Sequence, residues 1–395
     1  MSDESIKSKY GEILTFSAAR ERYNRGVIST GSVAFDYLIN GGFKEGMSSC
    51  LWGPSGSGKT TSLMIAIGQA LRRNPTRKVL FVDLDLGLNP DYGARTAIAS
   101  TEGITSTPLV ENAKYDSTRK LWIITDDFGV EYKMTDAEHD EALHYGDKLA
   151  QALGDKFFWV GRMPGGDLHD LLVEQIETNE YQMIVIDPQD EIYPKSLVDN
   201  DIEKEDQGKR SKFLGHFSSS LKQVVYNFDT ALIYTAQMRA GRGQYGSYPE
   251  MTGGNRFRHN MDIIVRFGIP KTEIFDVDGK KMLGQEVPIY IGKSRQSAST
   301  LKSNDSKMDT GKHVVARLIY GKGWDNDFAL MQLGEFSGVI QGRGHYSWVD
   351  KEGEIHKGHG RTKFMDAVKE AGKYEELWDT VVNSASGQGE DNDGN

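Results

Sequence analysis

The stretch Gly53-Pro54-Ser55-Gly56-Ser57-Gly58-Lys59-Thr60 decides the fold class of this 395-residue chain. It fits the pattern G-x-x-x-x-G-K-S/T at every position, follows the apolar run 47–52, and precedes a stretch with apolar residues at helical spacing. In such a strand–loop–helix unit, backbone N–H groups and the positive end of the helix dipole face phosphate oxygens. We expect Lys59 to reach the β- and γ-phosphates of ATP, and the Thr60 hydroxyl to bind Mg²⁺.

The flanking strand and helix favour this interpretation over a glycine-rich turn with a chance Lys-Thr pair. The loop residues predicted to bind the cofactor are Gly53, Pro54, Ser55, Gly56, Ser57, Gly58, Lys59, Thr60 and Thr61. From residue 31 onward the chain alternates short apolar runs with longer amphipathic stretches, which predicts an α/β fold with a mostly parallel central sheet. The predicted strands are 47–52, 78–82, 183–186, 231–236 and 263–267, with an antiparallel extension at 287–291 and 314–320.

Carboxylates close two of these predicted strands. The buried run 183–186 ends in Asp187, which behind a phosphate loop is typical of a second Mg²⁺ ligand beside Thr60. The run 78–82 is followed by Asp83 and Asp85, which alternation puts on one face of the strand. These two carboxylates either position the water for hydrolysis or cap the turn 87–90.

Composition narrows the class of protein. No apolar run approaches the ~20 residues of a membrane span, and the first residues lack the basic stretch and apolar core of a secretory signal. The single cysteine, Cys50, excludes an internal disulfide and a cluster of cysteine metal ligands. We therefore expect a cytoplasmic protein, in the cytoplasm of a bacterial host if it is phage-encoded, with no membrane partner.

The net charge of −10 by itself disfavours a nucleic-acid partner, but its distribution does not. Residues 101–156 hold twelve acids and six bases, and residues 386–395 hold three acids and no base. Nearly all of the excess negative charge thus lies in an apparent insertion and in an acidic tail that we expect to be disordered. If the tail competes with DNA for basic surfaces, deleting it strengthens DNA binding.

Taken together, these motifs resemble those of the RecA recombinase family. The match runs from 31–36 and 41–46 through the phosphate loop to 81–85 and 88–92. The resemblance implies that Asp85 activates the attacking water and that Tyr92 stacks on adenine. The family usually has Glu where this chain has Asp85, which is one methylene shorter, so the identity of the general base is open.

The resemblance also covers 235–239, where it implies that Gln237 senses the γ-phosphate and signals to DNA-binding loops. The stretch 239–258 follows and ends in Thr252-Gly253-Gly254-Asn255, a specific match to the second DNA-binding loop of the family. The prediction that its two tyrosines stack on bases or wedge between them rests on composition alone. A flexible surface loop is the alternative interpretation of this stretch. The predicted DNA-binding residues here are Arg239, Arg242, Tyr245, Tyr248, Gly253, Gly254, Asn255, Arg256 and Arg258.

Two further basic stretches match the family. Lys209, Arg210 and Lys212 resemble the first DNA-binding loop and its helix, although a solvated helix start is a nearly equal alternative. Lys293 and Arg295 resemble the basic pair that reaches the γ-phosphate bound to a neighbouring protomer, with an ordinary basic turn as the alternative. The second match implies an ATP site that is completed only between subunits.

We predict the following organisation. Residues 1–28 form an N-terminal oligomerisation segment, and 29–334 form a RecA-like ATPase core that carries the insertion 101–156. Residues 335–385 form a small α+β C-terminal domain, with short strands and helices near 362–371 and 375–382, and 386–395 form the tail. The insertion and the divergent details suggest a bacteriophage version or another distant version of the family.

The leading hypothesis is an ATP-dependent recombinase that forms helical filaments on single-stranded DNA and pairs it with homologous double-stranded DNA. It would use ATP and Mg²⁺, bind to copies of itself, and act as a DNA-dependent ATPase. A ring-shaped replicative helicase on the same core is the first alternative. A non-enzymatic mediator protein is the second, and the complete phosphate loop disfavours it.

Overall fold

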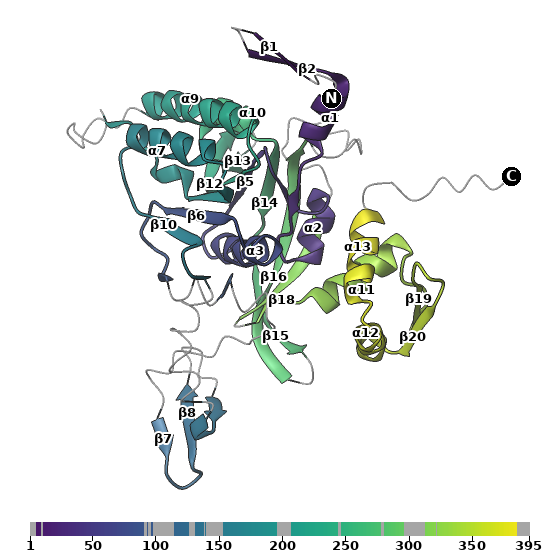
Figure 1. The fold of residues 1–395 in the computed structure, drawn as a ribbon. Coiled ribbons are helices and arrows are strands. Elements are labelled where there is room, and N and C mark those ends of the chain that lie inside the picture. The colour runs from purple at the N-terminus through teal and green to yellow at the C-terminus, as the bar shows by residue number, and fades with distance from the viewer. Residues whose placement is uncertain are drawn as a thin grey trace, which may run out of the picture.

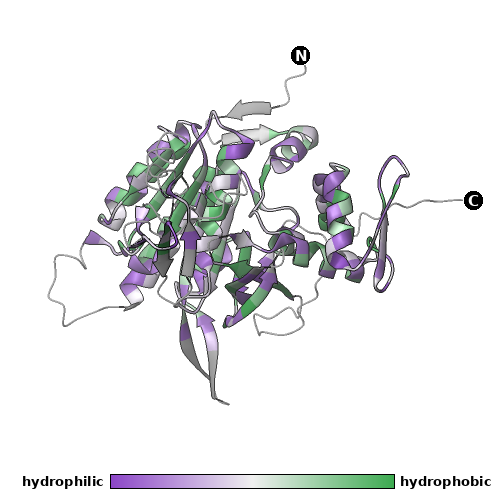
Figure 2. Ribbon diagram, turned by 90° about the horizontal axis from the view of Figure 1, so that it is seen from below, coloured by the Kyte–Doolittle hydropathy of each residue, from purple (hydrophilic) through white to green (hydrophobic). Residues whose placement is uncertain are grey.

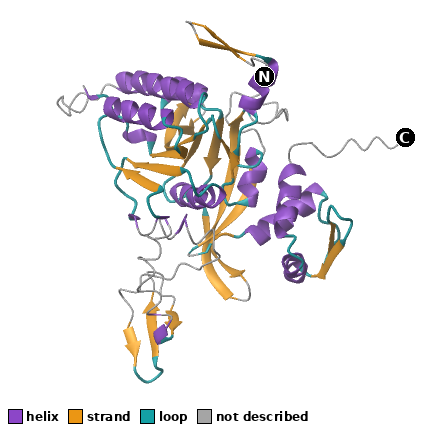
Figure 3. Cartoon of the chain, in the orientation of Figure 1, coloured by secondary structure: helices purple, strands orange, loops and turns teal. Residues whose placement is uncertain are grey.

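The computed structural model describes residues 5–8, 11–90, 93, 96–97, 114–125, 131–137, 139, 153–195, 207–243, 246–277, 280–295, 313–320 and 322–384. A large mixed sheet forms its centre, with helices on both faces (Figure 3). The six parallel strands lie in the order β10 (Phe157–Val160), β6 (Lys78–Asp83), β11 (Tyr181–Asp187), β12 (Ala231–Gly243), β5 (Ser48–Gly53) and β14 (Ile263–Phe267). The predicted α/β class and mostly parallel sheet are confirmed.

The predicted antiparallel extension is confirmed as well. It continues the sheet beyond β14 and includes two strands, β15 and β18, that the apolar runs did not indicate. Its members are β15 (Lys271–Val277), β16 (Lys280–Ser294), β17 (His313–Ile319) and β18 (Gly323–Trp324). Strand β10 was missed because it consists of only four residues next to the acidic stretch.

Side-chain alternation along the strands divides the core into two layers. On β6, Val79 and Phe81 pack into one cluster, whereas Leu80 and Val82 pack into the other. Strands buried on both faces are apolar throughout, as Figure 2 shows for the centre of the sheet. Helices α2 (Val33–Ile39) and α3 (Lys59–Arg73) cover the first face, and α7 (Gly165–Glu177), α9 (Gln207–Val225) and α10 (Gly254–Asn260) cover the second (Figure 1).

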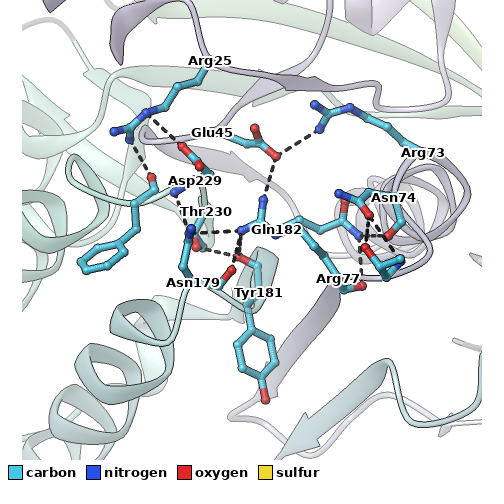
Figure 4. A network of polar contacts seen from close by, with 12 residues as sticks. Arg25, Glu45, Arg73, Asn74, Arg77, Asn179, Tyr181, Gln182, Asp229 and Thr230 are labelled. Atoms are coloured by element: carbon cyan, nitrogen blue, oxygen red, sulfur yellow. Dashed lines mark hydrogen bonds and ion pairs between the residues drawn. The ribbon is translucent and has the colours of Figure 1, made fainter. Parts of the chain in front are cut away.

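The amino-terminal ends of the parallel strands are held together by a charged network (Figure 4). Glu45 is buried, and its Oε1 lies 3.1 Å from Arg73 Nη1 and 3.2 Å from Arg77 Nη1. Arg25 forms an ion pair of 3.1 Å with Asp229. These pairs tie the chain that enters β5 to helix α3 and to the residue that precedes β6, so they fix the edge of the sheet opposite the phosphate loop.

Smaller units lie around this core (Figure 1). The first is a hairpin of β1 (Ser5–Ser8) and β2 (Gly11–Leu14), followed by helix α1 (Phe16–Tyr23) and by the pair β3 (Val27–Ile28) and β4 (Phe43–Lys44). The sequence analysis assigned residues 1–28 to an oligomerisation segment and did not predict the hairpin. Within the acidic insertion, a three-stranded sheet consists of β7 (Lys114–Asp116), β8 (Leu121–Thr125) and β9 (Glu131–Met134).

The C-terminal part combines a hairpin with helices, as predicted. It contains α11 (Asn326–Ser337), β19 (His345–Val349), β20 (Ile355–His359), α12 (Arg361–Glu370) and α13 (Tyr374–Ser384). Helices α11 and α13 pack against α2, so this unit joins the first face of the core. Among the described helices, none has both the length and the hydropathy of a membrane span. The predicted tail lies outside the described residues.

Candidate functional site

The phosphate loop joins the end of β5 to the start of α3, as the sequence predicted. Gly58 precedes the first residue of α3 and has a φ of 85°, a left-handed conformation that glycine adopts without a steric penalty. A Cβ atom placed on Gly56 would have no heavy atom within 4 Å, so the loop is open on this side. The first backbone N–H groups of α3 lack helical partners and are available to an anion.

Lys59 is bonded to the loop itself. Its Nζ donates to the carbonyl oxygens of Gly53, at 3.1 Å, and Pro54, at 2.8 Å. Burial lowers the pKa of Lys59, because the charged amino group has lost most of its water, and the nearby Asp187 and Asp190 carboxylates oppose the shift only in part. A phosphate group at the loop would give this buried cation the negative charge that stabilises it.

Asp187 lies between two threonine hydroxyls. Thr60 Oγ1 donates to Asp187 Oδ2 at 2.7 Å, and Thr235 Oγ1 donates to Asp187 Oδ1. Burial raises the pKa of Asp187, although both hydroxyls oppose the shift. A buried carboxylate oxygen beside a threonine hydroxyl is a suitable ligand set for Mg²⁺, which prefers hard oxygen ligands. The predicted pair therefore comes together, and Thr235 is a contact that the sequence analysis missed.

Asp83 and Asp85 occupy the turn after β6 and differ in exposure. Asp83 is buried and pairs with Asp187 in the register of β6 and β11, whereas Asp85 is exposed. Burial, followed by a hydrogen bond with Asp85, raises the pKa of Asp83 to about 6. Both carboxylates also accept turn N–H groups, Asp85 from Gly87 at 3.0 Å and Asp83 from Leu88 at 3.4 Å. The capping contacts that the sequence allowed are present, and Asp85 is still open to solvent.

Gln237 lies beside the phosphate loop. Strand β12 pairs with β5 so that Gln237 is opposite Gly53, and the Gln237 side chain is exposed. The predicted sensor is thus next to the first glycine of the loop. Tyr92, the predicted adenine contact, lies outside the described residues.

The stretch 239–258 is not an irregular loop. Strand β12 continues to Gly243 and turns into β13 (Gly246–Met251), and helix α10 follows. Glu250 stabilises this hairpin, because its carboxylate lies 3.1 Å from Arg239 and 2.9 Å from Arg258. The loop prediction was wrong because glycines and arginines dominate the local pattern, whereas cross-strand pairing decides the structure.

The predicted DNA-binding residues of this stretch have different surroundings. Asn255 and Arg256 are exposed, and Arg256 lies 3.2 Å from the His216 ring. Arg258 is partly buried and also donates to the Met251 carbonyl, so it holds the base of the hairpin. The φ of Gly253 is 100°, which explains the glycine there. The side chains of Arg242 and Tyr248 and the whole of Tyr245 lie outside the described residues.

The three basic residues at the start of α9 also differ in exposure. Lys209 and Lys212 are exposed, whereas Arg210 is partly buried. Arg210 donates to the carbonyl oxygens of Asp190 and Ile192, and its guanidinium lies 4.6 Å from the centre of the Tyr193 ring. Arg210 is therefore bound to the turn that follows Asp187, a contact that the sequence did not indicate.

Lys293 and Arg295 lie at the opposite edge of the sheet from the phosphate loop. On β16, Lys293 pairs with Ile264 of β14, which in turn pairs with Cys50 near the start of β5. Lys293 Nζ donates to the carbonyl oxygens of Arg258 and His259, at 3.1 and 2.9 Å. Burial and neighbouring cations lower the pKa of Lys293 to about 8. The pair therefore cannot contact a nucleotide on its own loop.

Arg295 is held by the adjacent strand end and the N-terminal segment. Its Nη1 donates to Asp262 Oδ1 at 3.2 Å, and Lys222 of α9 also pairs with Asp262. The Tyr23 hydroxyl of α1 donates to the Arg295 carbonyl at 2.7 Å. Basic residues from α9 and β16 thus gather around one buried carboxylate.

The strand–loop–helix unit and the strand-end carboxylate of a mostly parallel sheet define a P-loop nucleotide-binding protein of the α/β class. The family model for the RecA N-terminal domain matches residues 3–121 and 117–314. The chain therefore belongs to the RecA family and is a RecA-type recombination protein.

Similar proteins extend this match over most of the chain. Protein RecA of Oleidesulfovibrio alaskensis is 22% identical over 370 residues, which cover 93% of this chain and 85% of that protein. Protein RecA of Corynebacterium diphtheriae is 24% identical over 345 residues, with 87% and 73% covered. These relatives are bacterial, and the predicted bacteriophage source stays a prediction.

Proposed function

We propose that this chain forms helical filaments on single-stranded DNA, pairs that DNA with a homologous duplex and exchanges strands, with ATP bound between subunits. One observation carries the proposal: the phosphate loop and the Lys293–Arg295 pair lie at opposite edges of one sheet. Within one chain they cannot share a nucleotide. A head-to-tail neighbour brings the two edges together, and a contact of this type generates a filament when its rotation does not close.

The chain's own residues support ATP binding. Lys59 would exchange the loop carbonyls for phosphate oxygens, and Thr60 and Asp187 would hold Mg²⁺ with oxygen ligands. When bound, the metal ion supplies charge neutralisation for the phosphates. Tyr92 is the proposed adenine contact. On the far side, Lys293 and Arg295 of a neighbour would add positive charge at the γ-phosphate.

Asp85 is the proposed general base. It is exposed at the end of β6, two residues after the buried Asp83, so its carboxylate can accept a proton from a water molecule in the site. The water oxygen then bonds to the γ-phosphorus while the bond to the β–γ bridging oxygen breaks. Asp83 supports the turn through Leu88.

The proposed DNA contacts lie on α9, the β12–β13 hairpin and the turn before α10. Exposed cations would neutralise backbone phosphates, and close approach to the backbone is easiest at the glycines. The two tyrosines of the stretch 239–258 would stack on bases. The residues that we propose for this role are Lys209, Lys212, Arg239, Arg242, Tyr245, Tyr248, Gly253, Gly254, Asn255 and Arg256. Arg210 and Arg258 would act indirectly, because they stabilise the start of α9 and the base of the hairpin.

Electron microscopy of the chain with single-stranded DNA and a non-hydrolysable ATP analogue tests this proposal. We expect open helical filaments with DNA, and phosphate release from ATP that single-stranded DNA stimulates. The double variant Lys293→Ala/Arg295→Ala should still bind a fluorescent ATP analogue but fail to form filaments. Closed rings would favour the helicase alternative, and hydrolysis that ignores DNA would contradict the recombinase.

A further inference from the structure

The short turn after Asp187 contains two polar side chains that are buried. This turn, the 3₁₀ helix η2 (Gln189–Glu191), lies between the ends of β11 and β12. Gln189 is 0% exposed and Asp190 is 7% exposed. Buried polar groups need specific partners, because an unpaired one loses its hydration without compensation. Their partners belong to strand β12 and to two of the segments proposed to contact DNA, α9 and the turn before α10.

Asp190 connects Gln237 to helix α9. Its Oδ2 accepts the backbone N–H of Gln237 at 2.7 Å, at the point where β12 lies beside Gly53 of the phosphate loop. Its own backbone carbonyl accepts from Arg210, whose guanidinium also lies 4.0 Å from Asp190 Oδ1. A displacement of the Gln237 peptide therefore acts on Asp190, and through Arg210 on the first turn of α9.

Gln189 connects the backbone carbonyl of the same residue, Gln237, to the start of α10. Gln189 Nε2 donates to Thr252 Oγ1 at 2.9 Å, and Thr252 donates to the Gln237 carbonyl from its N–H, at 3.3 Å, and from its hydroxyl, at 3.2 Å. The backbone N–H and the backbone carbonyl of Gln237 thus both belong to one ring of hydrogen bonds. The ring runs from Gln237 to Asp190, along the chain to Gln189, and back through Thr252.

One atom of this ring lacks a partner among the described residues. Gln189 Oε1 is buried and accepts no hydrogen bond there. A Cβ atom placed on Gly253 would lie 3.3 Å from Gln189 Nε2, so the amide group is next to the glycine turn that precedes α10. An unsatisfied buried acceptor is destabilising, and a second arrangement of the turn that presents an N–H to Oε1 would relieve this. The ring of hydrogen bonds is therefore suited to two arrangements, one with Gln189 Oε1 unpaired and one in which it accepts an N–H.

We propose that Asp190 and Gln189 are positioning residues that transmit the nucleotide state from Gln237 to α9 and to the hairpin–α10 segment at the same time. This inference rests on the proposed function. Coupling between two ligands is reciprocal, so the same residues set how strongly ATP favours DNA binding and how strongly DNA favours ATP binding. Both residues are buried and act through the backbone of Gln237.

The test is the ratio of two DNA affinities, measured by fluorescence anisotropy of a labelled oligo-dT strand. One affinity is taken with a non-hydrolysable ATP analogue and the other with ADP. Asp190→Ala should lower this ratio about tenfold, while the affinity for a fluorescent ATP analogue without DNA stays within about twofold of the wild type. A purely structural defect would change stability and both DNA affinities but not their ratio.

Glu191→Ala is the matched control. Glu191 lies on the same turn, but its carboxylate pairs with Arg162 at 3.3 Å, so its variant should keep the wild-type ratio. If Asp190→Ala does not fold, Gln189→Leu serves in its place, because leucine fills a similar volume and removes the amide. It too should lower the ratio.

Two results would overturn the inference, and they are distinct. A wild-type ratio that persists in Asp190→Ala or in Gln189→Leu overturns the coupling alone. A wild-type protein that binds the strand equally in both nucleotide states overturns the proposed function, and the coupling with it.

Discussion

Buried charged groups have different partners at the two edges of the central sheet, where the parallel strands begin and where they end. At the amino-terminal edge, the buried Glu45 lies within ion-pair distance of two arginines (Figure 4). At the carboxyl-terminal edge, Lys59 is bonded to backbone carbonyls and Asp187 to threonine hydroxyls. Buried charge is thus held in direct ion pairs at one edge. At the other edge it is hydrogen-bonded to neutral groups and only partly compensated by opposite charges nearby.

This difference separates stability from function. Burial without full compensation disfavours the charged form, which is why the pKa of Lys59 is lowered and that of Asp187 is raised. Phosphate and Mg²⁺ supply the missing charges, so the carboxyl-terminal edge gains by binding. The amino-terminal edge is already compensated and gains nothing. Substitutions at the two edges should therefore have different consequences.

The largest effect is expected for Lys59→Ala. Without the amino group, charge at the β- and γ-phosphates loses its nearest cation, and ATP hydrolysis should fall at least about 100-fold. Phosphate release with saturating single-stranded DNA measures this. Because the nearby carboxylates compensate the buried Lys59 only in part, the melting temperature without nucleotide should change little. A strongly unfolded Lys59→Ala variant would contradict the claim that buried charge at the carboxyl-terminal edge serves binding and not stability.

Asp85→Asn should have the next largest effect. The amide cannot accept a proton from water, so turnover should fall about 100-fold. Affinity for a fluorescent ATP analogue should stay unchanged, since Asp85 is exposed and its described contacts, with the Asp83 carboxyl and the Gly87 N–H, lie within the turn. Turnover equal to the wild type would assign the general base to another group. Asp85→Glu, which restores the residue usual in the family, tests whether the shorter side chain slows hydrolysis.

At the other edge, Glu45→Ala should lower stability rather than activity. Removal of the buried carboxylate leaves Arg73 and Arg77 without their counter-charge, which costs about 2–3 kcal/mol of unfolding free energy. Urea denaturation measures it. Glu180→Ala is the control, because Glu180 forms an exposed ion pair with Lys78 whose loss should change stability little. Equal losses in the two variants would contradict the role of the buried network.

The smallest effect concerns pH and the contact between subunits. The pKa of Lys293 is lowered to about 8, so its amino group is charged below that pH and becomes neutral above it. Since a γ-phosphate prefers the charged form, filament assembly with the ATP analogue should weaken up to about tenfold between pH 8 and 9. Lys293→Arg keeps its charge and should lose this dependence. Light scattering at the two pH values compares the variants, and identical profiles would speak against a contact through Lys293.

Local pattern was sufficient wherever a site is formed by neighbours in sequence. The phosphate loop is eight consecutive residues between a strand and a helix, and its conformation follows from glycine geometry. Asp187 was predictable because a buried apolar run ends there, and parallel strands end at one edge. The hairpin within 239–258 was not predictable, because Glu250 pairs with arginines on both sides of it only after folding.

The sequence by itself determined the α/β class, the phosphate loop and the family, since each rests on residues close together in the chain. Only the tertiary structure decided which buried charges form ion pairs and which lack a full counter-charge until a ligand binds. Arg210 is bound to the turn after Asp187, and Lys293 lies at the edge away from the loop. Asp190 meets Gln237 across 47 residues. Such contacts depend on strand order and register, which no local pattern encodes.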